Sequence, residues 1–99
     1  MKINFTEKYS LNPAMLMRRC GYGQIRTREI SYAKRLGGTE YPRFHAYIDV
    51  TADGFTINLH VDQKQPSYGS QTAHSGEYEG ELVSGEGNRI RQAINEMKV

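Results

Sequence analysis

Two neighbouring segments in the middle of the chain alternate apolar and polar residues. The apolar positions are Phe44, Ala46, Ile48 and Val50 in the first segment and Phe55, Ile57, Leu59 and Val61 in the second. A period of two is the spacing of a β-strand that buries one face. The TADG stretch between them contains Gly54, which can adopt the left-handed conformation that suits a tight hairpin turn. The pattern therefore predicts two antiparallel strands joined by a short turn.

The register of this hairpin decides which polar residues meet. If Val50 pairs with Phe55, both apolar rows lie on one face and His45 lies opposite His60. If the turn consists of Asp53 and Gly54 alone, His45 lies opposite Asp62 instead. Both registers place the same side chains on the polar face, namely His45, Tyr47, Asp49, Asn58, His60 and Asp62.

The remaining segments predict two helices and one further strand. Asn12, Pro13 and Gly21 are typical of helix ends and predict a short helix over 13–20. Residues 25–36 predict an edge strand with imperfect alternation. An apolar stripe at helical spacing predicts a C-terminal helix over 84–97, formed by Val83, Ile90, Ala93, Ile94 and Met97.

The segment 64–80 has the Gly, Ser and Gln content of a long loop, in which GEYEGEL could add a fourth strand. The expected fold is therefore α+β in the order αβββα. It has a three-stranded, or with the extra segment four-stranded, antiparallel sheet with both helices on its apolar face.

Composition limits the class of protein. The 99 residues are expected to form a single domain over 1–99. The 13 basic and 11 acidic residues give a net charge of +2, distributed as +5 over residues 1–50 and −3 over 51–99. The single cysteine, Cys20, is expected to be a packed thiol, and no segment resembles a signal peptide or a membrane span. A cytoplasmic location with no membrane contact is therefore expected.

The polar face suggests two kinds of binding site besides an ordinary solvated surface. Two imidazoles and a carboxylate could bind zinc, with His74 from the long loop completing a set of His45, His60, Asp62 and His74. This spacing matches no established ligand signature. The metal site is accordingly kept as an alternative.

The main functional prediction is binding of RNA or another polyanion. Basic residues interleaved with tyrosines are typical of surfaces that bind single-stranded nucleic acid, because cations contact phosphates and rings stack on bases. If strand 25–36 lies beside the hairpin, the flanking cations Arg26, Arg28, Lys34 and Arg43 border the polar face.

Binding is favoured over catalysis. The adjacent His74 and Ser75 rarely reach nucleophile and base geometry from neighbouring positions, and the Gly-rich tracts lack a phosphate-binding signature. The acidic residues Glu77, Glu79, Glu81 and Glu86 are expected on a solvated face. A sheet of so few strands also leaves open edges, so that a homodimer formed through a strand edge is a third alternative.

Overall fold

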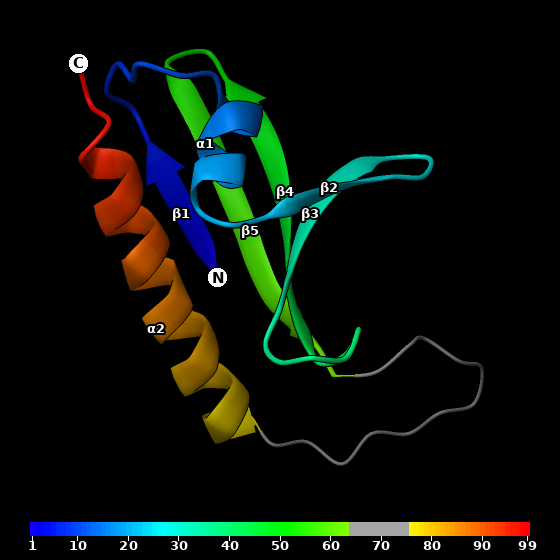
Figure 1. Ribbon diagram of the computed structural model, residues 1–99. Coiled ribbons are helices and arrows are strands. Elements are labelled where there is room, and N and C mark those ends of the chain that lie inside the picture. Colours follow the sequence, from blue (N-terminus) through cyan, green and yellow to red (C-terminus); the bar gives the residue numbers. More distant parts are fainter. Residues whose placement is uncertain (64–75) are drawn as a thin grey trace.

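A five-stranded antiparallel sheet forms the centre of the computed structural model, which describes residues 1–63 and 76–99. Its strands stand in the order β1-β5-β4-β3-β2, as Figure 1 shows. Their bounds are Lys2–Phe5 for β1, Gly23–Arg26 for β2, Ile30–Arg35 for β3, Arg43–Thr51 for β4 and Gly54–Asp62 for β5. The helices are α1, Pro13–Arg19, and α2, Gly76–Asn95. The α+β class is as expected, with five strands in place of three or four.

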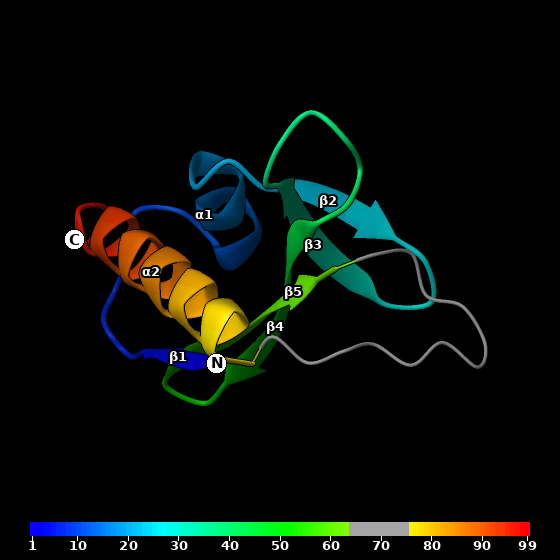
Figure 2. The ribbon, with the colours of Figure 1, turned by 90° about the horizontal axis from the view of Figure 1, so that it is seen from below.

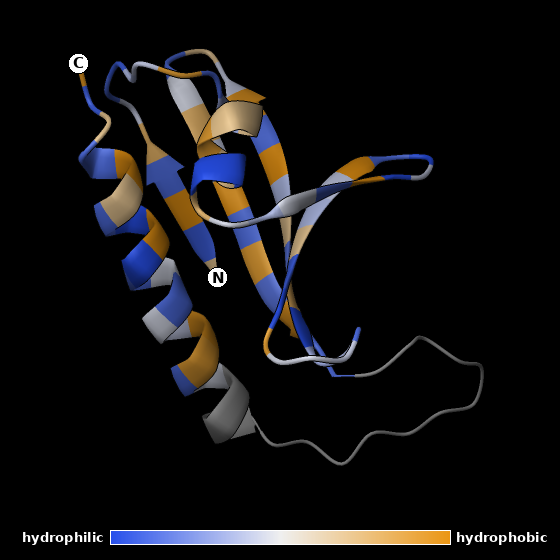
Figure 3. Cartoon of the chain, viewed as in Figure 1, coloured by the Kyte–Doolittle hydropathy of each residue, from blue (hydrophilic) through white to orange (hydrophobic). Residues whose placement is uncertain are grey.

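The β4–β5 hairpin has the first of the two registers considered. Val50 pairs with Phe55 and His45 pairs with His60. Apolar and polar residues alternate visibly along both strands (Figure 3). The apolar rows face the helices, and both helices lie on the same side of the sheet (Figure 2).

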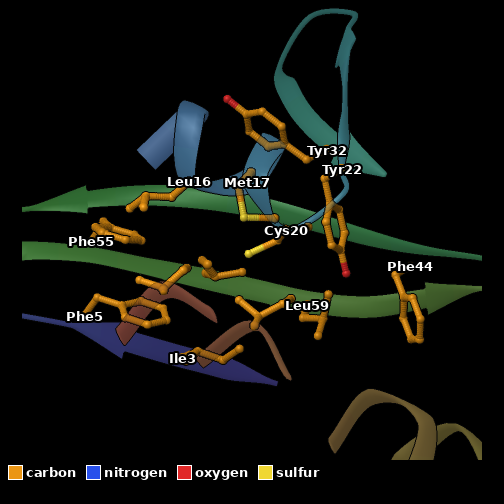
Figure 4. Packing of buried hydrophobic residues seen from close by; sticks show 14 residues of the cluster. Ile3, Phe5, Leu16, Met17, Cys20, Tyr22, Tyr32, Phe44, Phe55 and Leu59 are labelled. Carbon is orange, nitrogen blue, oxygen red and sulfur yellow. The ribbon is translucent and has the colours of Figure 1, made fainter. Parts of the chain in front are cut away.

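The buried core lies between this apolar face and the two helices. Leu16 and Met17 of α1 and Ile90 and Ile94 of α2 are fully buried against Ile57 and its neighbours. Figure 4 shows Cys20 among these side chains; it is 2% exposed, which confirms the packed thiol. The apolar stripe predicted for the C-terminal helix thus faces the sheet.

Helix α1 begins and ends as its sequence predicts. The Asn12 side chain accepts a hydrogen bond of 2.9 Å from the Met15 backbone N–H. Gly21 follows the helix with a φ of +96°, a left-handed conformation that favours glycine. The Asn12 contact, and the hydrogen bond of 2.9 Å from the Gly21 backbone N–H to the Arg18 carbonyl, satisfy backbone groups that a short helix otherwise leaves open.

Two predictions about secondary structure are wrong, and one strand was not predicted. Residues 25–36 do not form one strand, because the polar run Thr27, Arg28 and Glu29 makes a turn between β2 and β3. The N-terminal strand β1 was not predicted, although Ile3 and Phe5 alternate with polar residues and are buried. The GEYEGEL segment is helical, since α2 begins at Gly76 rather than near residue 84. The predicted 64–80 loop accordingly ends earlier, and its residues 64–75 lie outside the described residues.

Gly54 is needed for a reason other than the expected one. Gly21 is the only described glycine with a positive φ, so Gly54 does not adopt the left-handed conformation. A Cβ at position 54 would instead overlap the carbonyl oxygen of Phe5. The close approach of β1 to the hairpin turn therefore excludes any side chain there.

We expect Gly54→Ala to lower the free energy of unfolding by about 2 kcal/mol or more, because β1 must shift to admit the methyl group. Urea denaturation measures the loss. Gly37→Ala is the matched control, since a Cβ there meets nothing within 4 Å, and its effect should stay within about 0.5 kcal/mol. Equal stabilities of the two variants would contradict the close contact.

Candidate functional site

The side of the sheet that points away from both helices carries the predicted polar residues. We call this side the polar face; its central members are Arg43, His45, Tyr47 and Asp49 of β4 and Asn58, His60 and Asp62 of β5. Direct pairs across the ladder are His45 with His60, Tyr47 with Asn58, and Arg43 with Asp62. The register thus brings all six predicted hairpin residues to one surface.

Asp62 is the centre of a cluster on this face. Its Oδ2 atom lies 2.8 Å from His45 Nδ1 and 3.2 Å from Arg43 Nε, and its Oδ1 atom lies 3.2 Å from His60 Nε2. The side chains of His45 and Asp62 are only 12% and 19% exposed, whereas that of His60 is 47% exposed. A partly buried carboxylate therefore contacts one guanidinium and two imidazoles, one of them open to solvent.

Ring contacts extend the cluster along the polar face. The centroid of His45 lies 4.8 Å from that of Tyr47 and 5.0 Å from that of His60. Tyr47 and His60 stack with centroids 6.0 Å apart and planes inclined by 19°. Beside them, the guanidinium carbon of Arg43 lies 4.6 Å from the Tyr41 ring centroid. These contacts hold three rings in a fixed arrangement.

Ser31 belongs to the cluster and was not identified from the sequence. It lies on β3, its Oγ atom is 2.9 Å from His45 Nε2, and it is 4% exposed. Its position follows from the pairing of Tyr32 with Ala46, which places the odd-numbered residues of β3 on the polar face. The alternation of residues within one segment does not show how that segment pairs with another strand, so the sequence did not reveal that Ser31 lies beside His45.

The environment of His45 favours its neutral form. Burial lowers the pKa of His45 below its ordinary value, and the nearby Asp62 only partly opposes this effect. A neutral imidazole carries one proton, and the acceptor-only carboxylate of Asp62 favours placing it on Nδ1. The Nε2 atom then accepts a hydrogen bond from the Ser31 hydroxyl.

Three of the four predicted metal ligands come together. One donor atom each from His45, His60 and Asp62 all lie within 4.8 Å of one another. His74, the fourth predicted ligand, lies outside the described residues. Two imidazole nitrogens and a carboxylate form a donor set suited to zinc and related divalent ions.

The other polar residues of the face lie along a shallow groove. Asn58 Nδ2 donates a 2.9 Å hydrogen bond to Asp49 Oδ2. Both residues line the groove with Tyr47, Ile48 and the β2–β3 turn, which contributes Arg28, Glu29 and Ile30. Arg28 therefore borders the polar face, as expected.

Arg26 and Lys34 do not border the polar face, contrary to the expectation. Lys34 pairs with the buried Phe44, and Arg26 follows Gln24, which pairs with Tyr32 on the helix side. The reason is the register of β3 against β4, which places the even-numbered residues of β3 on the helix side, together with Arg26, the partner of Ile30. Of the four flanking cations, Arg28 and Arg43 remain beside the cluster.

A second polar cluster is buried on the helix side and contradicts the expectation for Glu86. Glu86 is 7% exposed and accepts hydrogen bonds from the Tyr22 hydroxyl, 2.7 Å, and from Arg89 Nε and Nη2, 2.8 and 2.7 Å. Arg89 Nη2 also donates to the backbone carbonyl of Cys20 at 2.7 Å. This cluster joins α2 to the segment after α1.

Comparisons with protein-family models, with curated proteins and with solved structures found no match. Among the described residues, neither helix combines the length and apolar character needed to cross a membrane.

We expect the buried Glu86 to make stability depend on pH. Burial alone would raise the pKa of Glu86, but hydrogen bonds from Arg89 and Tyr22 lower it below its ordinary value. Its contribution is therefore present above the unfolded pKa of about 4.3 and is lost as the pH falls through the lower folded value. Glu86→Gln should cost about 3 kcal/mol at pH 7.

Urea unfolding from pH 7 to pH 3 tests this expectation. The difference in stability between the wild type and Glu86→Gln should shrink on acidification, because the glutamine does not titrate. Glu81→Gln replaces an exposed glutamate of the same helix and should cost less than about 0.5 kcal/mol. A pH-independent difference for Glu86→Gln would show that its charge does not contribute.

Proposed function

We propose that the protein binds a divalent transition metal ion of the zinc type through His45, His60 and Asp62. The observation that carries this proposal is the convergence of their donor atoms, all within 4.8 Å of one another. His45 Nδ1 and His60 Nε2 already point at the two oxygens of one carboxylate. A cation there would replace protons that these atoms now share.

The surroundings supply the outer partners that a metal site needs. A histidine ligand usually donates its second N–H to a neighbouring group, which fixes its orientation. When Nδ1 of His45 binds the metal, its proton moves to Nε2, and the Ser31 hydroxyl can turn from donor to acceptor. Arg43 holds the Asp62 carboxylate in place from the other side.

Three described ligands leave at least one coordination position of a tetrahedral ion open. The sequence predicts that His74 fills it and closes the site. Solvent at this position would instead make the site one of the catalytic kind. A His74→Ala variant distinguishes the two, since it weakens zinc binding only in the first case.

We expect the purified, chelator-treated protein to bind one equivalent of zinc in calorimetric titrations at pH 7.5. His60→Ala should weaken binding more than about 100-fold, since even outer-shell changes cost 10- to 100-fold. Because the His60 side chain is 47% exposed, its loss should leave the fold intact. Asp49→Asn changes an aspartate of the same face outside the cluster and should leave affinity unchanged.

Circular dichroism of His60→Ala confirms that the variant is folded before its affinity is compared. Zinc binding that is equally strong in His60→Ala and the wild type would reject the proposed site. If His60→Ala and Asp49→Asn lowered the affinity for zinc equally, the effect would come from the overall surface charge rather than from ligation by His60.

Binding of single-stranded RNA is a second candidate, favoured by the ring arrangement of His45, Tyr47 and His60. Rings on a sheet face that neither helix covers can stack on bases, and Arg28 at the groove offers a phosphate contact. Fewer unpaired cations border the polar face than the sequence predicted, so the structure supports RNA binding less well. Arg43 is paired with Asp62, and Arg26 and Lys34 face the other side.

We expect short RNA oligonucleotides to bind with an affinity that falls as salt is added, because phosphate contacts release counterions. Tyr47→Ala should weaken binding about tenfold through lost stacking, and Arg28→Gln should reduce the dependence on salt. Arg26→Gln, on the helix side, is the control. Fluorescence anisotropy measures all three, and an equal effect of Arg26→Gln would contradict an interface on the polar face.

A homodimer formed through a sheet edge remains a prediction. In the described sheet, β1 and β2 are the outer strands, and each is only four residues long. Open backbone groups on such strands can pair with another chain. A dimer of this kind would not itself cover the polar face, because pairing at an edge extends the sheet sideways.

A further inference from the structure

The polar face contains a second arrangement with a chemistry of its own. Ser31 Oγ lies 2.9 Å from His45 Nε2, and His45 Nδ1 lies 2.8 Å from Asp62 Oδ2. The two ring nitrogens of His45 thus connect a hydroxyl to a carboxylate. In acyl-transfer enzymes the same arrangement of imidazole and carboxylate activates a serine hydroxyl as a nucleophile. We propose that in the metal-free protein Ser31 is a base-activated nucleophile that accepts acyl groups from small esters.

The positions of the protons follow from the hydrogen-bond partners. The carboxylate of Asp62 can only accept, so the proton of the neutral imidazole lies on Nδ1. The lone pair of Nε2 then points at the Ser31 hydroxyl. Arg43 and His60 hold Asp62 from two further directions and fix the carboxylate behind His45.

An ester would have to approach Ser31 where β3 separates from β4. The described pairing of these strands ends at Tyr32 and Ala46, and the tip of the β2–β3 hairpin turns away from β4 (Figure 1). The groove at this separation is lined by Ile30, which precedes Ser31, and by Tyr47, whose ring contacts His45. Ser31 is only 4% exposed and lies behind the residues that line the groove rather than among them, so we expect only short acyl groups to reach its hydroxyl.

The reaction balances without a further reagent besides water. The Ser31 O–H proton passes to His45 Nε2 while Oγ forms a bond to the ester carbonyl carbon. The ester C–O bond then breaks, and the leaving alcohol takes the proton from Nε2. Water, deprotonated by the same nitrogen, releases the carboxylic acid and restores the hydroxyl.

This proposal and the metal site use His45 in different ways. Zinc on Nδ1 would place the ring proton on Nε2, where it could no longer accept the serine proton. The two uses therefore exclude one another in a single molecule, and zinc becomes a test of the mechanism. The serine chemistry requires no metal and can be measured with a chelator present.

The experiment incubates the full chain with p-nitrophenyl acetate in the presence of a chelator, and measures nitrophenolate release and the acetylated peptide by mass spectrometry. We expect acetyl transfer to Ser31 in the wild type and none at this position in Ser31→Ala. Asp62→Asn should slow acylation of Ser31 at least about 100-fold, because the histidine tautomer is no longer fixed. Ser10→Ala, which changes an exposed serine, should not alter the rate.

Peptide mapping separates Ser31 from lysines and histidines that the ester modifies directly. Acetylation confined to those residues, or Ser31 acetylation unchanged in Asp62→Asn, would overturn the proposal. Zinc at a concentration shown by calorimetry to saturate His45 should suppress acylation, and full acylation of the zinc-bound protein would also overturn it. Absence of zinc binding would reject the metal proposal alone, because the acylation assay contains none.

Discussion

The pairing of β4 with β5 is the constraint on which the rest of the structure depends. Its register places the alternating aliphatic and phenylalanine residues of both strands on the side of the helices and the candidate site residues of both strands on the other face. A shift by one residue in either strand would exchange the two faces of that strand and bury histidine and aspartate in the core. The same register that permits a core therefore assembles the cluster around Asp62.

Competition for one carboxylate governs the chemistry of the polar face. Asp62 contacts Arg43, His45 and His60 through two oxygens, so each partner limits what the others can do. A cation bound there would displace ring protons and add positive charge to a face whose nearby arginine is already paired. If the surface binds a metal ion or an anion, that binding would consequently be linked to proton binding, and a change in one would alter the affinity for the others.

The sequence predicts the parts of the fold that repeat within one segment. The alternation in 44–50 and 55–61 was sufficient for the hairpin and its two-face pattern, but it left two registers open, and the structure decides that His45 lies opposite His60. The stripe through Ile90 and Ile94 was sufficient for the packed side of α2. Such patterns are predictable because the pitch of one element decides which residues share a face.

Contacts between distant segments could not be predicted in this way. Ser31 reaches His45 only because β3 pairs with β4 in a particular register, and Glu86 is buried only because Tyr22 and Arg89 satisfy its oxygens. The four-residue strand β1 is too short for its alternation to stand out from chance. Its place at the edge depends on the Phe5 carbonyl lying against Gly54.

The reactivity of the buried Cys20 thiol can report how often the surrounding part of the fold opens. Cys20 is the only cysteine in the chain and is 2% exposed, and burial raises its pKa above the ordinary value. A thiol reagent can react only after the segment following α1 separates from the sheet and from the Arg89 guanidinium that binds the Cys20 carbonyl. The rate of alkylation thus measures how often the segment around Cys20 opens, either locally or together with the rest of the chain.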